Sequence, residues 1–247
     1  MRSWAGHARL RTNRMQAKLI ESVGIAPDVR HFVFEAQPID RLAFKPGQFV
    51  SLSDRVNGHM ITRAYSIASA PCSGNRFELC LNRVPGGIFS PHLFQLVPGD
   101  SVEMQPPLGT FVLREPLRDS LLIATGTGIA PFRSMLPAAL KPNGPAITLL
   151  FGVRYASHLL YRREFEALEQ AYPQFRFWPT LTQAGTDWGG RIGRVQTHLA
   201  EAVAAIAVDH AALDIYLCGL KPMVDDVRLY LKERGFDRKQ IRYEKYD

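Results

Sequence analysis

The second half of the chain alternates short apolar segments with longer amphipathic ones, and this alternation restricts the possible folds more than any other feature. Short apolar runs that end at glycine or polar residues are typical of buried strands, and apolar residues at helical spacing predict helices between them. Because strand–helix–strand units form parallel pairs, we expect residues 115–247 to form an α/β domain whose parallel sheet has helices on both faces. The expected strands are 120–126, 146–153, 174–182, 213–219 and 241–246, and the expected helices are 129–140, 158–172, 193–206 and 221–235.

Residues 15–114 follow a different pattern, in which short, partly alternating segments are separated by turn sequences such as APD, KPGQ, VNG and VPGD. Strands at this spacing predict an antiparallel barrel or sandwich, interrupted by one helix at 90–96. We therefore expect two domains with a boundary near 114–120. The six expected strands are 17–23, 30–36, 47–53, 60–69, 76–84 and 100–113.

The net charge of +7 on this 247-residue chain is concentrated near its start, because five of the excess basic residues precede the first acidic residue, Glu21. We interpret residues 1–14 as a solvated basic tail, with a transit-like segment or an extended start as alternatives. No basic stripe with interleaved aromatic residues is present, so nucleic acid is not an expected partner. No apolar run is long enough to cross a bilayer, and the first residues lack the apolar region of a secretory signal, so no membrane association is expected.

The three cysteines, Cys72, Cys80 and Cys218, have neither the spacing of a zinc site nor that of an iron–sulfur site, and we expect no metal. An odd number of cysteines does not make a complete disulfide framework. A reducing cytoplasm is therefore the expected location.

The first expected strand of the second half ends in the glycine-containing turn ATGTGIAPF, residues 124–132. Ligands of open parallel sheets bind beyond the carboxyl ends of the strands. Gly126 and Gly128, on either side of Thr127, would let the backbone approach a pyrophosphate at a helix N-terminus. Pro131 suits the first turn of that helix. The third glycine of the dinucleotide fingerprint is absent, so a tight strand–helix turn without a ligand is the alternative.

Arginines near the ends of the next strands bear on the choice of coenzyme. Arg154 follows 146–153, where NAD-binding folds usually carry an acidic residue for the ribose 2′-hydroxyl, and an arginine there favours a 2′-phosphate. Arg191 and Arg194 could add to a phosphate site. These residues favour NADPH, with plain surface charges as the alternative.

The stretch RAYS, residues 63–66, places a cation, a phenol and a hydroxyl in one half-buried strand, and four further motifs follow it. The motifs are Arg63-x-Tyr65-Ser66, Gly86-Gly87-x-x-Ser90, Gly126-Thr127-Gly128-Ile129-Ala130-Pro131, Cys218-Gly219-Leu220-Lys221-Pro222-Met223 and Glu244-Lys245-Tyr246. In this order and combination they resemble the ferredoxin–NADP(+) reductase family of FAD- and NAD(P)-binding flavoproteins, including its bacterial ferredoxin/flavodoxin reductases. The resemblance covers about residues 15–247.

The resemblance implies that residues 15–114 form a Greek-key β-barrel that binds a flavin. Arg63 would pair with a flavin phosphate, which its planar guanidinium suits. Tyr65, next to Ala64, would pack on the isoalloxazine, and Ser66 would hydrogen-bond N5, the atom that accepts the hydride. Because side chains alternate along a strand, Ser66 is expected on the face opposite Arg63 and Tyr65.

The loop PGGIFS would form the pyrophosphate cradle in this family. Gly86 and Gly87 would let the backbone approach the pyrophosphate closely, and Ile88 and Phe89 are the next residues of this cradle. Ser90 would be the N-cap of the helix. The resemblance favours FAD over FMN, although some relatives use FMN.

Two C-terminal motifs are implied to complete the site. Cys218 would lie beside the nicotinamide, with Gly219 and Met223 next to the coenzyme; a small buried residue after a strand is the alternative. Tyr246 would stack on the flavin and move aside for the nicotinamide, while Glu244 would assist proton transfer. Ser66, Cys218 and Glu244 are thus the implied catalytic residues.

The chain departs from the family pattern at two places. Asp247 follows Tyr246, so an extra carboxylate lies beside the expected ring. In addition, Leu181-Thr182-Gln183 lacks the Ser-Arg pair of many NADP-specific reductases, and the segment TLTQAGTDWGGRIGRV resembles NADH-linked oxygenase reductases. Arg154 indicates NADPH and 181–183 indicate NADH, so the coenzyme preference stays open.

The function implied is that of an NAD(P)H oxidoreductase whose FAD takes hydride from the coenzyme and gives single electrons to a ferredoxin or flavodoxin. The chain has no iron–sulfur cysteines, so the acceptor would be external, and we expect a monomer. The alternatives are an NADH-dependent reductase component of an oxygenase system, a diaphorase for small acceptors, and a flavin-binding subunit of a larger complex. The last is the weakest, because the C-terminal cysteine cluster of dihydroorotate-type subunits is absent.

Overall fold

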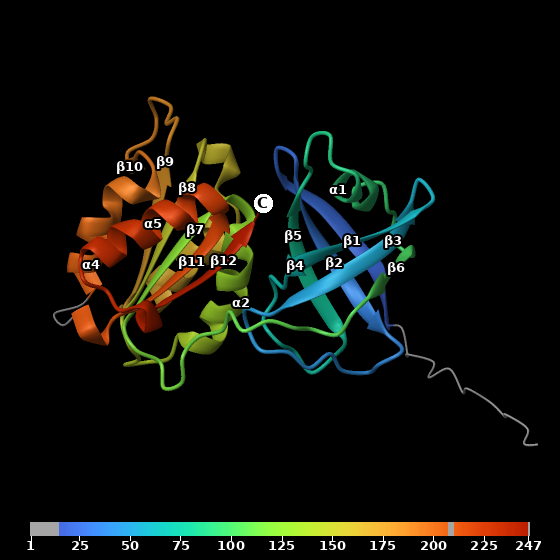
Figure 1. Ribbon diagram of the computed structural model, residues 1–247, viewed down its shortest axis with the longest axis horizontal. Coiled ribbons are helices and arrows are strands. Elements are labelled where there is room, and N and C mark those ends of the chain that lie inside the picture. The colour runs from blue at the N-terminus through green and yellow to red at the C-terminus, as the bar shows by residue number, and fades with distance from the viewer. Residues whose placement is uncertain (1–14, 207–209, 247) are drawn as a thin grey trace, which may run out of the picture.

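The computed structural model describes residues 15–206 and 210–246. The predicted basic tail, 1–14, and the departure at Asp247 lie outside the described residues. The described part forms two six-stranded sheets that follow one another along the chain and lie side by side (Figure 1). The C-terminal strand ends between them.

The first sheet is antiparallel with the strand order β4-β3-β6-β1-β2-β5. Ile67, just after β4, forms an antiparallel bridge with Leu79 of β5, so the two edge strands meet and the sheet closes. Alternate residues of β2, such as Phe32 and Phe34, point inward and are fully buried. The elements are β1 (Met15–Ala26), β2 (Val29–Gln37), β3 (Phe49–Val56), β4 (His59–Ser66), β5 (Arg76–Asn82), α1 (Phe89–Leu93) and β6 (Ser101–Met104). The predicted antiparallel barrel is confirmed.

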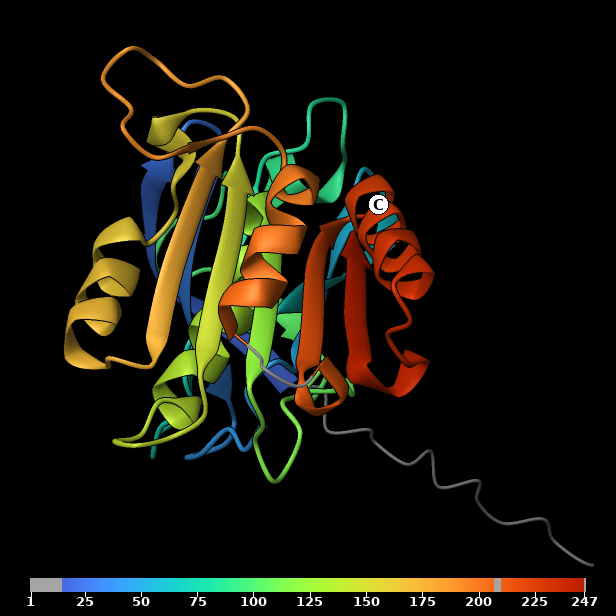
Figure 2. The ribbon, with the colours of Figure 1, turned by 90° about the vertical axis from the view of Figure 1, so that its left-hand side faces the viewer.

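The second sheet is parallel with the strand order β10-β9-β8-β7-β11-β12 (Figure 2). Its strands are β7 (Ser120–Thr125), β8 (Ile147–Val153), β9 (Phe175–Leu181), β10 (Arg191–Ile192), β11 (Asp214–Leu220) and β12 (Ile241–Tyr246). The α-helices are α2 (Ala130–Ala139), α3 (Arg162–Ala171), α4 (Leu199–Ile206) and α5 (Lys221–Glu233). The predicted α/β architecture is confirmed. The two-residue strand β10 was not predicted, because it is too short to show a strand pattern.

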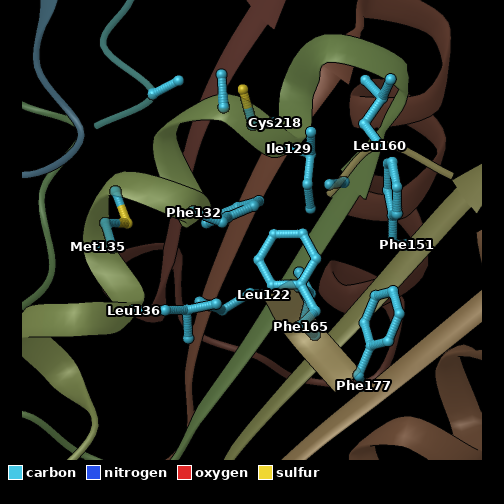
Figure 3. Close-up of a cluster of buried hydrophobic side chains, with 14 of the residues drawn as sticks. Leu122, Ile129, Phe132, Met135, Leu136, Phe151, Leu160, Phe165, Phe177 and Cys218 are labelled. Carbon is cyan, nitrogen blue, oxygen red and sulfur yellow. The ribbon is translucent and has the colours of Figure 1, made fainter. Parts of the chain in front are cut away.

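Helices cover both faces of the parallel sheet because residues of each central strand alternate between two apolar clusters. Leu122 of β7 packs with α2 and α3 in one cluster (Figure 3), whereas Leu121 and Ile123 pack with α4 and α5 in the other. The strand order reverses direction at β7, whose neighbours are β8 and β11. In such sheets the crevice for a ligand lies at this reversal, beyond the carboxyl ends of the strands.

The two sheets share an apolar contact. Ala68 and Cys80 of the barrel belong to the same buried cluster as Phe132 and Met135 of α2, and Phe111 of the connecting segment joins them. In the described residues, no helix is long and apolar enough to cross a membrane.

Candidate active site

A cavity of about 690 Å³ lies between the barrel and the C-terminal strand. Its volume is in the range of small-molecule and cofactor sites. The walls come from four segments distant in sequence: the end of β4, the loop after β5, the turn after β7, and β12. Four of the five motifs quoted above, with Arg63, Gly87, Thr127 and Tyr246 among their residues, therefore meet around one cavity.

The end of β4 presents Arg63, Tyr65 and Ser66 to the same cavity. Ser66 is buried, whereas Arg63 is exposed and donates from Nη1 only to the neighbouring carbonyl of Thr62 at 2.8 Å. The remaining N–H groups of Arg63 thus stay available for an anion. Tyr65 stacks on Phe89 with ring centroids 6.4 Å apart, and burial raises the pKa of its phenol, so it remains neutral.

A chain of hydrogen bonds connects the barrel to the last strand. The Ser66 hydroxyl donates to Glu244 Oε1 at 2.6 Å and lies 2.8 Å from the Tyr246 hydroxyl. Because the single Ser66 proton is directed to Glu244, Tyr246 donates to Ser66. Two of the implied catalytic residues, Ser66 and Glu244, are thus bonded directly, and Tyr246 binds the same serine hydroxyl.

Burial affects the protonation of Glu244, Cys218 and Tyr246. It raises the pKa of Glu244, although the Ser66 hydrogen bond acts in the opposite direction by favouring the carboxylate. Burial also raises the pKa values of Cys218 and Tyr246, which therefore stay protonated. Cys218 is fully buried and has no thiolate chemistry at neutral pH.

The turn after β7 fits closely against the end of β11. A Cβ atom on Gly128 would lie 2.3 Å from the carbonyl oxygen of Cys218, and one on Gly219, whose φ is +153°, would lie 2.3 Å from Thr125 Oγ1. Both positions therefore require glycine. Gly126 has a φ of +54°, and it is exposed with open space beside it.

The end of β7 contains a buried polar atom that is not hydrogen-bonded. The Oγ1 atom of Thr125 is buried and has no hydrogen-bond partner among the described residues. The buried Met223 of α5 lies next to Gly219. Pro131 occupies the first turn of α2 after the 3₁₀ turn η1 (Gly126–Ile129), as predicted. An orphaned hydroxyl beside open glycine backbone fits a polar ligand such as a nucleotide.

The loop before α1 is built differently from the prediction for Ser90. The N-cap of α1 is Ile88, without a side-chain cap, and Ser90 lies inside the helix. Its hydroxyl instead accepts a hydrogen bond from Val84 N at 3.0 Å, while Gly87 N bonds Val84 O at 2.9 Å. The predicted N-cap role of Ser90 is wrong, because the loop folds back by these two bonds and engages the hydroxyl. Gly86, with a φ of +71°, is exposed with open space beside it.

The arginines named for the coenzyme differ in their surroundings. Arg154 is exposed at the end of β8 and contacts Gln183 Oε1 through Nε at 3.2 Å. Arg191 is paired with Glu201 at 2.7 Å and stacks on Trp178 with 3.6 Å from Cζ to the ring centroid. Glu201 therefore compensates the charge of Arg191, whereas no carboxylate among the described residues pairs with Arg154.

Sequence reasoning missed a group of polar residues beside the cavity. Arg133 of α2 contacts Glu78 of β5 and Glu164 of α3, and Tyr161 and Cys80 lie beneath it. The only sequence signal for this group is the position of Arg133 directly after the GTGIAPF turn.

Comparisons with known proteins agree with this geometry. Residues 16–113 match the family described as oxidoreductase FAD-binding domain, and residues 122–229 match the oxidoreductase NAD-binding domain. A ferredoxin–NADP reductase B of Sorangium cellulosum (strain So ce56) is 39% identical over 238 residues, which are 94% of this chain and 97% of that protein. The chain belongs to the ferredoxin–NADP reductase family. It is accordingly an oxidoreductase with an FAD-binding and an NAD-binding domain.

Members of the family with other names are also similar. The toluate 1,2-dioxygenase electron transfer component of Pseudomonas putida is 33% identical over 84% of this chain, which spans only 60% of that relative's length. Among solved structures, the Amycolatopsis cytochrome P450 reductase GcoB has a TM-score of 0.82 and 31% identity, covering 94% of this chain and 69% of that one. Ferredoxin–NADP reductase folds thus occur both alone and inside longer reductases.

Proposed function

We propose that the protein oxidises NADPH through a bound FAD and passes the electrons one at a time to an external ferredoxin or flavodoxin. The observation that carries this proposal is the hydrogen-bonded chain from Ser66 of the barrel to Glu244 and Tyr246 of the last strand. It brings the RAYS motif and the C-terminal Glu-Lys-Tyr motif of the family to one point of one cavity. Bound FAD would supply the two-electron to one-electron conversion that side chains cannot perform.

The barrel residues would bind and orient the flavin. Arg63 has uncommitted N–H groups for a phosphate, and the exposed backbone at Gly86 offers a further donor, whereas Gly87 N is already bonded to Val84 O. Tyr65, held by Phe89, offers a flat apolar face that excludes water from the ring system. Ala64, Ile88 and Ser90 line the same cavity.

The residues of the α/β domain would place the coenzyme and handle the proton. Gly126, Thr127 and Gly128 would accept its pyrophosphate, and Cys218 and Gly219 would lie at the nicotinamide. The Ser66 hydroxyl would hold a proton at its Oγ atom, with Glu244 as the group that exchanges it with solvent. Tyr246, now bonded to Ser66, would swing away when the nicotinamide enters.

The surroundings of the arginines support NADPH as the coenzyme. The exposed guanidinium of Arg154 carries an uncompensated charge at the end of β8, where an acidic residue would have indicated NADH. Arg191 is the weaker candidate for the 2′-phosphate because Glu201 already pairs with it. Gln183 would then be a neutral neighbour of Arg154 rather than a determinant of NADH.

A second cavity supports an acidic carrier protein as the electron acceptor. It measures about 1280 Å³ and shares Phe49 and Glu244 with the first cavity. Its charged lining residues are predominantly basic, with the cations Arg228, Lys232, Arg238 and Arg242 against the carboxylates of Asp237 and Glu244. A basic surface beside the redox site would attract and orient an acidic partner. We also propose that the protein acts as a monomer in the cytoplasm, where its exposed Cys72 and two buried cysteines stay reduced.

The carrier proposal can be tested by steady-state reduction of a ferredoxin and of a flavodoxin by NADPH. Lys232→Glu should raise the KM for the carrier by about tenfold at low salt and leave the KM for NADPH unchanged. Lys141→Glu, an exposed lysine after α2, is the matched control and should change neither. Equal KM values for the carrier in wild type and Lys232→Glu would reject this docking surface.

A reductase component of an oxygenase system is the second candidate. The 33% identity to the dioxygenase component and the absence of an arginine in 181–183 favour it. A higher kcat/KM for NADH than for NADPH, together with no reduction of ferredoxin or flavodoxin, would support this candidate.

A further inference from the structure

The guanidinium of Arg133 lies at the contact between the barrel and the α/β domain and binds a carboxylate from each. Its Nη1 atom contacts Glu78 Oε2 of β5 at 2.5 Å, and its Nε atom contacts Glu164 Oε2 of α3 at 2.7 Å. A third contact, from Nη2 to the other Glu164 oxygen at 3.3 Å, makes the pair within the α/β domain bidentate. The first of these pairs crosses between the domains and the second does not.

The same turn of α2 also holds the backbone that continues the RAYS strand. Arg133 Nη1 donates to the carbonyl of Ala68 at 3.1 Å, and the Ser134 hydroxyl donates to the carbonyl of Ser69 at 2.6 Å. Ser69 and Ala68 are in turn fixed to β5, because Glu78 N donates to Ser69 Oγ at 3.1 Å and Ala68 N donates to Glu78 O at 2.8 Å.

These contacts join two functional segments over a very short path. Ala68 follows Ser66 by two residues, and Arg133 follows Pro131, the last residue of the nucleotide turn, by two residues. Both segments are rigid, since one continues a strand and the other is the start of a helix. A displacement of α2 relative to β5 would therefore move the nucleotide turn relative to Ser66.

The surroundings of Arg133 restrict its movement. Its guanidinium stacks on Tyr161 with 4.4 Å from Cζ to the ring centroid, and the Tyr161 hydroxyl is 2.9 Å from His31 Nδ1 of β2. Burial lowers the pKa of His31, so this histidine is neutral at neutral pH and adds no competing cation. The Arg133 side chain is only 19% exposed.

We propose that Arg133 and Ser134, bound to Glu78 and to the Ala68–Ser69 backbone, form an interdomain clamp that sets the distance between the coenzyme and the flavin. Arg133 is a positioning residue, because it would touch neither reactant. The proposal rests on the proposed function, in which the C4–H bond of the coenzyme breaks and its hydrogen and two electrons pass to the flavin. Half-buried ion pairs add little net stability but can fix one geometry, and hydride transfer depends steeply on that geometry.

The test compares Glu78→Gln with Glu35→Gln in the FAD-loaded protein. Both variants remove one barrel carboxylate that pairs with an arginine, but Glu35 pairs with Arg76 of its own domain at 4.0 Å. Anaerobic stopped-flow reduction by NADPH gives the limiting rate and the coenzyme Kd separately. We expect Glu78→Gln to lower the limiting rate by about tenfold and Arg133→Met by about 10–100-fold, with Kd changed less than about threefold. Glu35→Gln should remain within about twofold of wild type.

A second readout does not depend on activity. Hydrogen–deuterium exchange of the peptides covering 66–70 and 126–136 should become faster in Glu78→Gln and Arg133→Met and stay unchanged in Glu35→Gln. Arg133→Lys keeps the charge but not the forked contacts, and it should restore the rate only partly.

Two results would overturn the clamp. The first is a limiting rate within twofold of wild type in folded, FAD-loaded Arg133→Met. The second is a rate loss that is equal in Glu78→Gln and Glu35→Gln, which would mean general destabilisation. If neither NADPH nor NADH reduces the flavin of the wild-type protein, the proposed function is overturned, and the clamp with it. If the wild-type flavin is reduced and the Glu78 and Arg133 variants react at the same rate, only the clamp is overturned.

Discussion

Replacing Ser66 by alanine removes the hydroxyl that joins the barrel to the C-terminal strand. The hydroxyl donates to Glu244 at 2.6 Å and accepts from Tyr246 at 2.8 Å, and the Ser66 residue is only 6% exposed, so water cannot easily replace it. A hydrogen bond to a charged group contributes about 1.5–3 kcal/mol. Since about 1.4 kcal/mol corresponds to a factor of ten in rate, we expect hydride transfer to slow by about 10–100-fold if Ser66 aligns the reacting groups.

The pH dependence should change as well. The Ser66 hydrogen bond favours the ionised form of Glu244, so its loss raises the pKa of that carboxyl further. A limb of the rate profile that depends on ionised Glu244 should therefore move to higher pH in Ser66→Ala.

The assay is anaerobic stopped-flow reduction of the FAD-loaded protein over a range of pH values. Ser53→Ala is the matched control, because Ser53 is a buried serine of the same hairpin whose hydroxyl bonds only Thr62, at 2.8 Å, among the contacts described. It should keep the wild-type limiting rate. A rate for Ser66→Ala within twofold of wild type, with an unmoved pH profile, would refute the assigned role of Ser66.

Three further predictions follow from the site. Arg154→Gln should lower kcat/KM for NADPH by about 10–100-fold and leave that for NADH within about twofold, because only the 2′-phosphate ion pair is lost; steady-state kinetics with both coenzymes would check this. Gly128→Ala should reduce the free energy of unfolding by about 1–3 kcal/mol, since its Cβ would lie 2.3 Å from the carbonyl oxygen of Cys218, whereas Gly24→Ala, with open space around it, should change little in chemical denaturation. Burial raises the pKa of Glu244, so wild-type stability should fall as pH rises from the ordinary carboxyl range through the raised value, and Glu244→Gln should lack this loss in denaturation curves measured at several pH values.

The elements with strong patterns could be predicted from sequence. Barrel strands such as β2 alternate inward and outward residues, and the parallel strands are short apolar runs before glycine or polar turns, so both sheets were expected at about their observed places. The sixth barrel strand is the exception, because it ends at Met104 and not at 113. Four of the five motifs line the cavity, whereas the motif at 218–223 does not. By contrast, β10 is only two residues long and pairs through Arg191 and Ile192, which carry no strand pattern.

Contacts between distant segments were harder to foresee. Ser66 and Glu244 are 178 residues apart, and only the family resemblance indicated that they meet. Nothing in the sequence connects Arg133 with Glu78, because their pairing depends on how α2 packs against β5. The N-cap assignment of Ser90 failed for a related reason, since a serine before a helical segment can equally accept a hydrogen bond from a folded-back loop, as it does from Val84.

The central claim is that the two domains hold FAD and a nicotinamide coenzyme in one cavity, so the most direct test is an anaerobic titration of the purified protein with NADPH and then NADH. We expect yellow protein whose visible flavin absorption is bleached stoichiometrically, and by NADPH at lower concentration than by NADH. Colourless protein that binds no added FAD, or flavin absorption that neither coenzyme changes, would contradict it.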